Sequence, residues 1–366
     1  MAISHLKIKS FRNHKDKTFN FNRAITVIFG DNGSGKTSIL EAIHLLSVGK
    51  SFKTSKKTEL IRRGEDQLVL NGYFIKKEIE TIVSTLINKK SKQKIKINGK
   101  NLFKRKDLLG KNSVVLLSPE EQKISKGAAK ERRLFFDKLF SITSQKYLVN
   151  LQDYTKTIKQ RNSVLKSDLN IKKVSHNLKI WDEILIEKGL NLWNQRALCT
   201  EKFNKTFTNT VKDYDKNIKA EISYNRRNIE RTEYNEKIKN NKERDFFLKR
   251  TTFGPHTDDF TFLWNDKVIR NYGSEGEHKT FLILLKLTEL KYIEEVTGEQ
   301  PILLLDDLFA TIDLDRSKKT ISILKKIERE KEEPIQTIIT TTDLLNLKKT
   351  NLNLESVEKE VIELRR

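Results

Sequence analysis

Residues 24–37 read AITVIFGDNGSGKT, and this stretch decides how the chain folds. The apolar run 24–29 is typical of a strand that is buried on both faces. Gly30–Thr37 fits the pattern G-x-x-x-x-G-K-[ST], and residues 38–46 read as a helix that Gly49 can end. A phosphate-binding loop requires this order of strand, turn and helix, because backbone N–H groups and the helix N-terminus must face phosphate oxygens. The stretch therefore predicts a nucleoside-triphosphate site.

Each residue of this loop has an expected part in the site. Lys36 is expected to contact the β- and γ-phosphates of the nucleotide, and the Thr37 hydroxyl is expected to bind Mg²⁺. The glycines let the backbone turn tightly enough for successive N–H groups to face the phosphates. The predicted nucleotide-binding residues of the loop are Gly30, Asp31, Asn32, Gly33, Ser34, Gly35, Lys36, Thr37 and Ser38.

Residues 301–307 read PILLLDD, which indicates a buried strand that ends in two carboxylates. A carboxylate at the carboxyl end of a strand beside the phosphate-binding loop is well placed for Mg²⁺. Asp306 is therefore the second predicted metal ligand. Asp307 is predicted to be catalytic together with Lys36, by orienting or deprotonating the attacking water. Because neighbouring residues on a strand alternate, we expect these two carboxylates to point to opposite faces.

Residues 272–277 read YGSEGE and open a long helical pattern. Ser274 and Glu277 fit a capping box, so one interpretation of the segment is simply the start of a helix. The other interpretation is functional: Ser274, Gly276 and the free N–H groups of this helix would form a second phosphate-binding device. The residues alone leave both interpretations open.

The composition favours an acidic partner. The chain has 366 residues and a formal net charge of +23, which favours nucleic acid or an anionic membrane surface, although a general bias towards lysine would also raise the charge. No apolar run approaches the ~20 residues that span a bilayer. The single cysteine, Cys199, excludes intramolecular disulfides. We therefore expect a cytoplasmic protein that does not enter the membrane.

The remaining segments suggest how the chain is organised. Several short β runs fill residues 67–103, where Asn71-Gly72 and Asn98-Gly99 are read as turns and the second pair indicates a hairpin. After residue 118 the apolar spacing becomes helical. The charge-dense segment 225–245 is expected on the surface, as a loop or a frayed helix.

The phosphate-binding loop, the serine–glycine signature and the Asp-Asp strand, in that order, resemble the head of an ATP-binding cassette protein. Further segments resemble the RecF family nearly from end to end. Two features depart from these patterns: Glu275 and Glu277 stand where the family usually carries glutamine at one or both positions, and Thr341-Thr342 stand where transporters carry a histidine. The segments that carry the resemblance are 11–13 (FRN), 40–43 (LEAI), 49–52 (GKSF), 118–120 (SPE), 132–137 (RRLFFD), 160–162 (QRN), 181–182 (WD) and 254–259 (GPHTDD).

The resemblance implies an α/β fold of the ABC type. A mixed sheet around the P-loop helix, joined by antiparallel strands, would form the ATPase lobe, and the second lobe would be mainly helical. Arg12 joins the residues expected at the nucleotide. The implied division places residues 1–118 and 298–366 in the ATPase lobe, 119–252 in the helical arm of the second lobe, and 253–297 in its strand and signature helix.

The resemblance also implies a function. Such a head would bind ATP and Mg²⁺, dimerise with ATP, and hydrolyse it weakly and under stimulation by DNA. Its expected partners are gapped and duplex DNA, junctions of duplex and single strand, and the mediators RecO and RecR, with which it would help load the RecA recombinase at the nucleoid. A transporter-like or structural-maintenance ATPase head, and a P-loop kinase or simple scaffold, are the alternatives.

Overall fold

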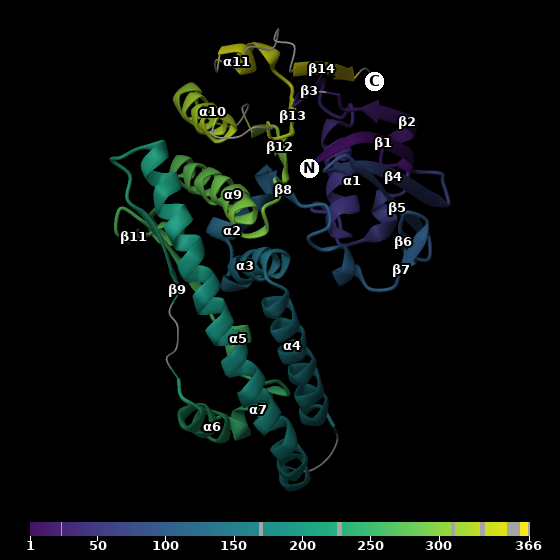
Figure 1. Ribbon diagram of the computed structural model, residues 1–366. Coiled ribbons are helices and arrows are strands. Elements are labelled where there is room, and N and C mark those ends of the chain that lie inside the picture. Colours follow the sequence, from purple (N-terminus) through teal and green to yellow (C-terminus); the bar gives the residue numbers. More distant parts are fainter. Residues whose placement is uncertain are drawn as a thin grey trace. The chain divides into compact units, whose positions relative to one another are not determined.

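The computed structural model describes residues 1–22, 24–167, 171–224, 229–308, 312–329, 334–349 and 359–364 (Figure 1). The chain divides into two compact units. The first unit contains Met1–Lys123, Asn209–Ile218 and Gly273–Arg366, and the second contains Ile124–Thr208 and Lys219–Tyr272.

A parallel sheet in the first unit carries the phosphate-binding loop. The strand order is β14-β3-β13-β12-β8, and each neighbouring pair is parallel. The strand that precedes the loop therefore lies inside the sheet and is covered on both faces, which is why its sequence is almost continuously apolar. The strands are β3 (Ile25–Gly30), β8 (Val114–Leu117), β12 (Ile302–Asp306), β13 (Thr337–Thr341) and β14 (Lys359–Leu364).

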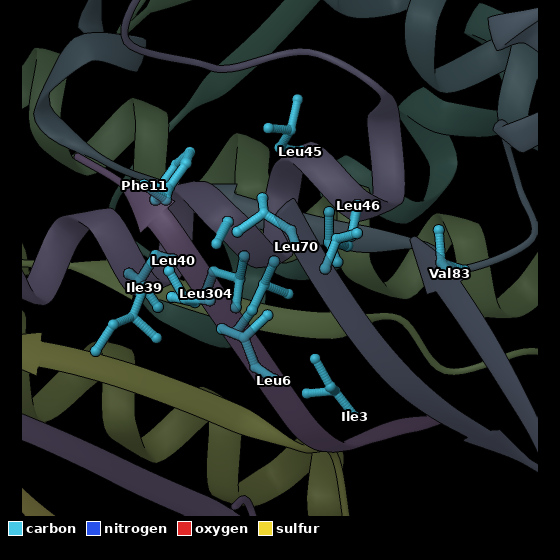
Figure 2. Close-up of a cluster of buried hydrophobic side chains, with 14 of the residues drawn as sticks. Ile3, Leu6, Phe11, Ile39, Leu40, Leu45, Leu46, Leu70, Val83 and Leu304 are labelled. Atoms are coloured by element: carbon cyan, nitrogen blue, oxygen red, sulfur yellow. The ribbon is translucent and has the colours of Figure 1, made fainter. Parts of the chain in front are cut away.

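An antiparallel sheet is the second layer of this unit, in the order β2-β1-β4-β5-β6-β7. Helix α1 (Lys36–Val48) contacts strands of both sheets and so lies between them. Figure 2 shows its side chains Leu40 and Leu46 in one cluster with Leu6 of this sheet and Leu304 of the parallel sheet. The strands are β1 (Ala2–Phe11), β2 (His14–Asn20), β4 (Gln67–Lys76), β5 (Ile79–Asn88), β6 (Gln93–Ile97) and β7 (Lys100–Leu102).

The two predicted Asn-Gly turns have different outcomes. Asn98 and Gly99 connect β6 to β7 with φ values of 47° and 80°, as a two-residue hairpin turn requires, so this prediction is confirmed. The turn at Asn71-Gly72 is wrong, because both residues lie inside β4. A Cβ atom on Gly72 would lie 2.8 Å from Leu46 Cδ1 of α1. This glycine therefore permits close packing between the sheet and the helix.

The second unit is mainly helical, as expected, and contains a small antiparallel sheet in the order β11-β10-β9. The segment 225–245 is not simply a surface segment: where it is described Tyr234, Ile238 and Asp245 are buried, so that expectation is wrong there. The elements of this unit are α2 (Lys123–Lys126, which begins at the boundary), α3 (Ala129–Thr143), α4 (Gln145–Leu165), α5 (Ile171–Tyr214, whose last residues belong to the first unit), β9 (Ala220–Tyr224), α6 (Arg231–Asn240), α7 (Lys242–Leu248), β10 (Phe260–Trp264), β11 (Lys267–Val268) and α8 (Ile269–Tyr272).

The signature helix belongs to the first unit. The expected division places 253–297 in the second lobe, whereas the compact units separate at Gly273. Helix α9 (Glu275–Thr297) is buried around most of its middle and contacts β8, which explains its grouping. The division into functional lobes stays a prediction. The other helices of this unit are α10 (Leu314–Arg329), α11 (Leu344–Lys349), and the 3-10 helices η1 (Lys57–Leu60), η2 (Arg105–Leu108) and η3 (Pro119–Gln122); η4 (Pro255–Thr257) lies in the second unit.

None of the helices described is both long enough and apolar enough to cross a membrane.

Candidate nucleotide site

The glycine-rich turn forms as predicted between β3 and α1. Gly35 precedes the first turn of α1 with φ 102°, a conformation that favours glycine. A Cβ atom there would lie 2.6 Å from Nε2 of His14 and 2.7 Å from Oδ1 of Asn13. Space and backbone conformation therefore both require glycine at this position.

Two residues for which the sequence predicted no role, Asn13 and His14, contact carbonyl oxygens of this turn. Asn13 Nδ2 donates to the carbonyl oxygen of Gly33 over 3.2 Å, and His14 Nε2 lies 3.2 Å from that of Gly35. A carbonyl only accepts, so His14 must carry its proton on Nε2 for this bond. Burial is the main cause that lowers the pKa of His14, which favours the neutral ring. The available signal was the segment 11–13 (FRN), which carries part of the family resemblance and includes Asn13.

Lys36 lies at the start of α1 with its ammonium against the turn. Its Nζ donates to the carbonyl oxygens of Gly30 over 2.7 Å and Asp31 over 2.8 Å. Burial lowers the pKa of Lys36, and the nearby carboxylates of Asp307, Asp306 and Asp31 oppose that shift. The ammonium is thus held beside the loop by oxygen atoms and by negative charge.

The two predicted metal ligands meet. Thr37 Oγ1 donates to Oδ1 of Asp306 over 2.8 Å, and Thr340 Oγ1 at the end of β13 donates to the same oxygen over 2.8 Å. Burial raises the pKa of Asp306, while the hydrogen bonds from Thr37 and Thr340 act in the opposite direction. Because the Thr37 hydroxyl gives its hydrogen to Asp306, its oxygen lone pairs remain available to a cation.

Asp307 lies beyond the strand, so strand alternation is the wrong explanation for how it differs from Asp306. Strand β12 ends at Asp306, and Asp307 adopts φ 49°, which is uncommon for a residue other than glycine. Its amide donates to both the carbonyl and the Oγ1 of Thr340, each over 3.1 Å. This turn brings Asp307 to the wall of the nucleotide cavity.

Arg12 also lines this cavity, and its guanidinium forms two hydrogen bonds with the buried carboxylate of Glu41. Its Nε and Nη2 donate to Oε2 and Oε1 of Glu41 over 2.8 and 2.7 Å. The Glu41 side chain is 0% exposed. Glu41 is a residue that the sequence analysis missed, because its place in the middle of a helix carries no local sign of a buried pair.

The cavity has a volume of about 700 Å³, and basic side chains outnumber acidic ones in its lining. This balance suits a polyanion such as a triphosphate. The lining residues are Arg12, Asn13, Asn32, Gly33, Gly35, Lys36, Thr37, Ser38, Lys53, Glu59, Ile61, Arg62, Arg63, Asp307 and Thr340.

The signature residues lie elsewhere in the first unit. Ser274 and Glu277 form both bonds of the predicted capping box, which confirms that structural interpretation. A Cβ atom on Gly276 would lie 2.7 Å from the guanidinium of Arg316, so the helix start is closely covered there. Neither Ser274 nor Gly276 is among the residues that line the cavity.

The residues present fit a nucleotide with Mg²⁺. Ser34 Oγ and Asp307 Oδ1 are buried and have no hydrogen-bond partner within the described residues, as expected of groups that a ligand would satisfy. No group of three or more His, Cys, Asp or Glu side chains in the part of the chain that the structure describes could hold a metal ion. Mg²⁺ commonly binds through one or two protein oxygens together with substrate phosphates, and Thr37 and Asp306 suit that mode.

Comparisons with known proteins identify the family of the chain. The RecF/RecN/SMC N terminal domain family matches residues 2–363. The DNA replication and repair protein RecF of Lachnospira eligens is 32% identical over 363 residues, covering 98% of this chain and 97% of the relative. RecF of Clostridioides difficile is 35% identical over 338 residues, covering 90% of each chain.

Solved structures give the same result. A structure of the recombination mediator protein RecF with ATP, described as part of the RecFOR pathway, has a TM-score of 0.82 and 31% identity, covering 93% of this chain and 92% of that one. Its RecF-ATPrS counterpart has a TM-score of 0.81 and 32% identity, covering 94% and 93%. The Smc head of Pyrococcus furiosus, at 19% identity and a TM-score of 0.55 over 95% of this chain and 91% of that one, shares the fold. The expected ABC-type head fold is confirmed, and the chain belongs to the RecF family.

Proposed function

We propose that this chain is an ATP-switched DNA-binding protein of the RecFOR pathway. It would bind gapped DNA and junctions of duplex and single strand, and with RecO- and RecR-type mediators it would help load RecA. The observation that carries the proposal is the hydrogen bond between Thr37 and Asp306 beside a cavity of about 700 Å³, since it joins the phosphate-binding loop to the acidic strand. The RecF relatives, with 32–35% identity over nearly the full chain, support the pathway.

In this proposal ATP occupies the cavity and Mg²⁺, held by Thr37 and Asp306, neutralises charge on its phosphates. The backbone of Gly30–Ser38 would bind phosphate oxygens, and Lys36 would exchange its two carbonyl partners for them. Arg12 would add a positive charge whose position is fixed by Glu41. Each of these residues acts by position and charge, which is how proteins assist phosphoryl transfer.

Asp307 would accept the hydrogen bond of the attacking water and orient it. Its position at the cavity wall and its unsatisfied Oδ1 support this role. The strand β13 ends in threonines where transporters carry a histidine, so we expect slow hydrolysis that DNA stimulates. The nucleotide would then act mainly as a switch.

The switch we propose is an ATP-dependent homodimer. Ser274, Gly276 and the N–H groups at the start of α9 would bind the γ-phosphate of ATP held by a second copy. The capping box fixes the helix start and already uses the N–H groups of Ser274 and Glu277, so a phosphate would have to bind the other N–H groups of the first turn or replace these bonds. The side chains of Glu275 and Glu277 add negative charge there, which would weaken closure relative to a glutamine-containing signature.

The other head-type ATPases considered from the sequence have less support. The Smc head shares the fold at 19% identity, whereas the RecF structures match at 31–32%. The segments outside the ATPase motifs also resemble RecF.

The test is the release of labelled gapped DNA in the presence of ATP. Asp307→Asn keeps the shape of the side chain but cannot take a proton, so the variant should bind ATP, dimerise on gel filtration, and release DNA several-fold more slowly than the parent. Asp315→Asn, an exposed aspartate on α10, makes the same change of charge and is the control. Release at the parental rate from Asp307→Asn would contradict the proposal that hydrolysis opens the dimer.

A further inference from the structure

A second cavity, of about 810 Å³, lies at the end of α1 that is remote from the phosphate-binding loop. Leu45 of α1, Leu60 and Ile87 contribute to its apolar lining, and strands β5, β6 and β7 each supply residues to its wall. The loop that follows Gly49 completes the wall. Residues 49–52 carry part of the family resemblance, and of the residues that line this cavity only Lys53 also lines the nucleotide cavity.

The lining of the second cavity combines positive charge with hydroxyl groups and aromatic rings. Lys53 lies 3.9 Å from the carboxylate of Glu120, so part of the charge is offset from outside the lining. Phe103 is 93% exposed. None of the lining residues that the structure describes carries a carboxylate. The charged, hydroxyl and aromatic lining residues are Lys50, Lys53, Lys57, Lys123, Ser51, Thr54, Ser55, Phe52 and Phe103.

A ligand that matches this lining must carry several negative charges together with flat apolar groups. A single strand of nucleic acid has both, because its phosphates are charged and its bases are not covered by a partner strand. Proteins bind such strands with basic grooves and exposed aromatic rings on which bases stack. A duplex offers only the charges, since its bases are stacked and paired.

We propose that this second cavity binds a segment of single-stranded nucleic acid. Lysines at the rim contact its phosphates, and Phe103 stacks on a base. This inference rests on the proposed DNA-binding function and adds to it a place on the chain where the single strand binds.

Glu41 links the second cavity to the nucleotide cavity. It accepts two hydrogen bonds from Arg12, which lines the nucleotide cavity, and one from the hydroxyl of Ser51, which lines the second. Ser51 Oγ in turn accepts from the amides of Lys53 and Thr54 over 2.9 and 3.1 Å, which fixes the loop. Lys53 lines both cavities. A shift of Arg12 when nucleotide binds is therefore transmitted through Glu41 to the loop that follows Gly49. In this way the nucleotide alters the affinity of the second cavity for the single strand.

The experiment measures binding of a labelled oligothymidylate by fluorescence anisotropy. Phe103→Ala should weaken binding roughly 5-fold or more, since one stacked base contributes at least that much. Lys57→Glu should weaken it and lower the dependence on salt by about 0.7 for each phosphate that the variant no longer binds. Two variants serve as controls: Phe247→Ala removes a phenyl that is 84% exposed in the other unit, and Lys96→Glu changes an exposed lysine on β6. Lys96 alternates with Ile95, which faces the cavity, so it lies on the opposite side of the strand.

The outcomes separate this inference from the proposed function. A parent that binds gapped DNA with ATP while Phe103→Ala and Lys57→Glu keep parental oligothymidylate affinity would overturn the inference alone. A parent that fails to bind gapped DNA with ATP would overturn the proposed function. A labelled oligoglutamate that binds with the same sensitivity to Lys57→Glu, while oligothymidylate does not bind, would assign the cavity to an acidic protein segment and overturn the inference.

The link through Glu41 is tested with Ser51→Ala, which keeps the pair between Arg12 and Glu41 and removes the bond from Ser51 to Glu41, together with the acceptor of the Lys53 and Thr54 amides. In the parent, a slowly hydrolysed ATP analogue should change the affinity for oligothymidylate. In Ser51→Ala the ratio of affinities with and without the analogue should approach one, while binding of the analogue itself is kept. An unchanged ratio would rule out this route.

Discussion

The nucleotide cavity of the first unit and the network around Arg196 in the second unit differ in how completely their buried charged groups are paired. In the second unit Arg196, whose side chain is 1% exposed, donates to Asp137 over 2.9 Å and to Asp258 over 2.8 Å. Trp193 and Tyr224 donate to the same oxygen of Asp258 over 2.8 and 2.7 Å. The charges in this network are paired within the protein.

At the nucleotide cavity the pairing is incomplete. Ser34 Oγ in the loop and Asp307 Oδ1 at the cavity wall are two of the buried atoms that have no hydrogen-bond partner among the described residues, as is Arg161 Nη2 outside the Arg196 network. Asp307 also adopts φ 49°, a left-handed conformation that is uncommon for residues other than glycine. Leaving buried polar groups unsatisfied costs stability, so the contrast separates polar groups that maintain the fold from polar groups kept available for a ligand.

The largest effect should follow from breaking the network of the second unit. Arg196→Ala leaves Asp137 and Asp258 without their cation, and the loss of one partner from a buried pair typically costs about 3–5 kcal/mol of unfolding free energy. The three tryptophans of the chain, Trp181, Trp193 and Trp264, all belong to this unit, so their fluorescence during denaturant unfolding reports on it alone.

Arg231→Ala is the matched control in the same unit. Arg231 pairs with Glu183 over 2.8 Å, the distance of the Arg196–Asp258 pair, but the two side chains are 60% and 62% exposed. An exposed pair contributes less than about 1 kcal/mol. Equal losses for Arg196→Ala and Arg231→Ala would contradict the view that burial makes the network important.

An intermediate effect, on binding and not on folding, is expected at the nucleotide cavity. Lys36→Met should weaken ATP binding by about 1.5–3 kcal/mol, the range for a hydrogen bond that involves a charged group. We expect the variant to remain folded, and its unfolding midpoint checks this. Titration calorimetry measures the binding, with Lys17→Met on the exposed face of β2 as control. A variant with parental ATP affinity would refute the assignment of the loop.

The smallest effect should come from pH. Burial is the main cause that lowers the pKa of His256 below its ordinary value of 6.5, so the folded second unit prefers the neutral ring. The unfolded chain then binds more protons than the folded one below that value, and stability present above pH 6.5 is lost as the pH falls through the folded pKa.

His256→Gln should therefore reduce the loss of the tryptophan-detected unfolding midpoint between neutral and mildly acidic pH. His176→Gln, an exposed histidine of the same unit, should leave the parental pH dependence intact. If both variants keep the parental dependence, other groups account for it.

Local patterns predicted much of the first unit. The apolar run before the loop became β3, the following segment became α1, and the capping box formed at Ser274. These features depend on residues within a few positions of one another, so the sequence contains the whole explanation. The closeness of Thr37 and Asp306 was also expected, because sheet edges bring the ends of parallel strands together, whereas their hydrogen bond was not predicted.

Contacts between distant segments could not be predicted in the same way. Gly72 looked like a turn residue because Asn-Gly pairs are typical of turns. Its real role is close packing against Leu46, which lies many residues earlier on a helix, so no local pattern indicated it. Arg12 was expected at the nucleotide, but its pair with Glu41 was not, since nothing near either residue in the sequence indicates a buried pair. The same holds for Arg196 and Asp258, whose separation in sequence is 62 residues. Only tertiary packing determines which charges become buried.

The order of the parallel sheet has a consequence for how the protein is made on the ribosome. Strand β3, which leads into the phosphate-binding loop, pairs only with β13 and β14 among the described strands. Both are translated after the whole second unit, whose segments lie within residues 124–272. While a nascent chain emerges, β3 and its loop have no neighbouring strand, so the nucleotide site matures late in translation. The helical unit can fold first, and during that time the parallel sheet of the first unit is still incomplete and accessible to chaperones.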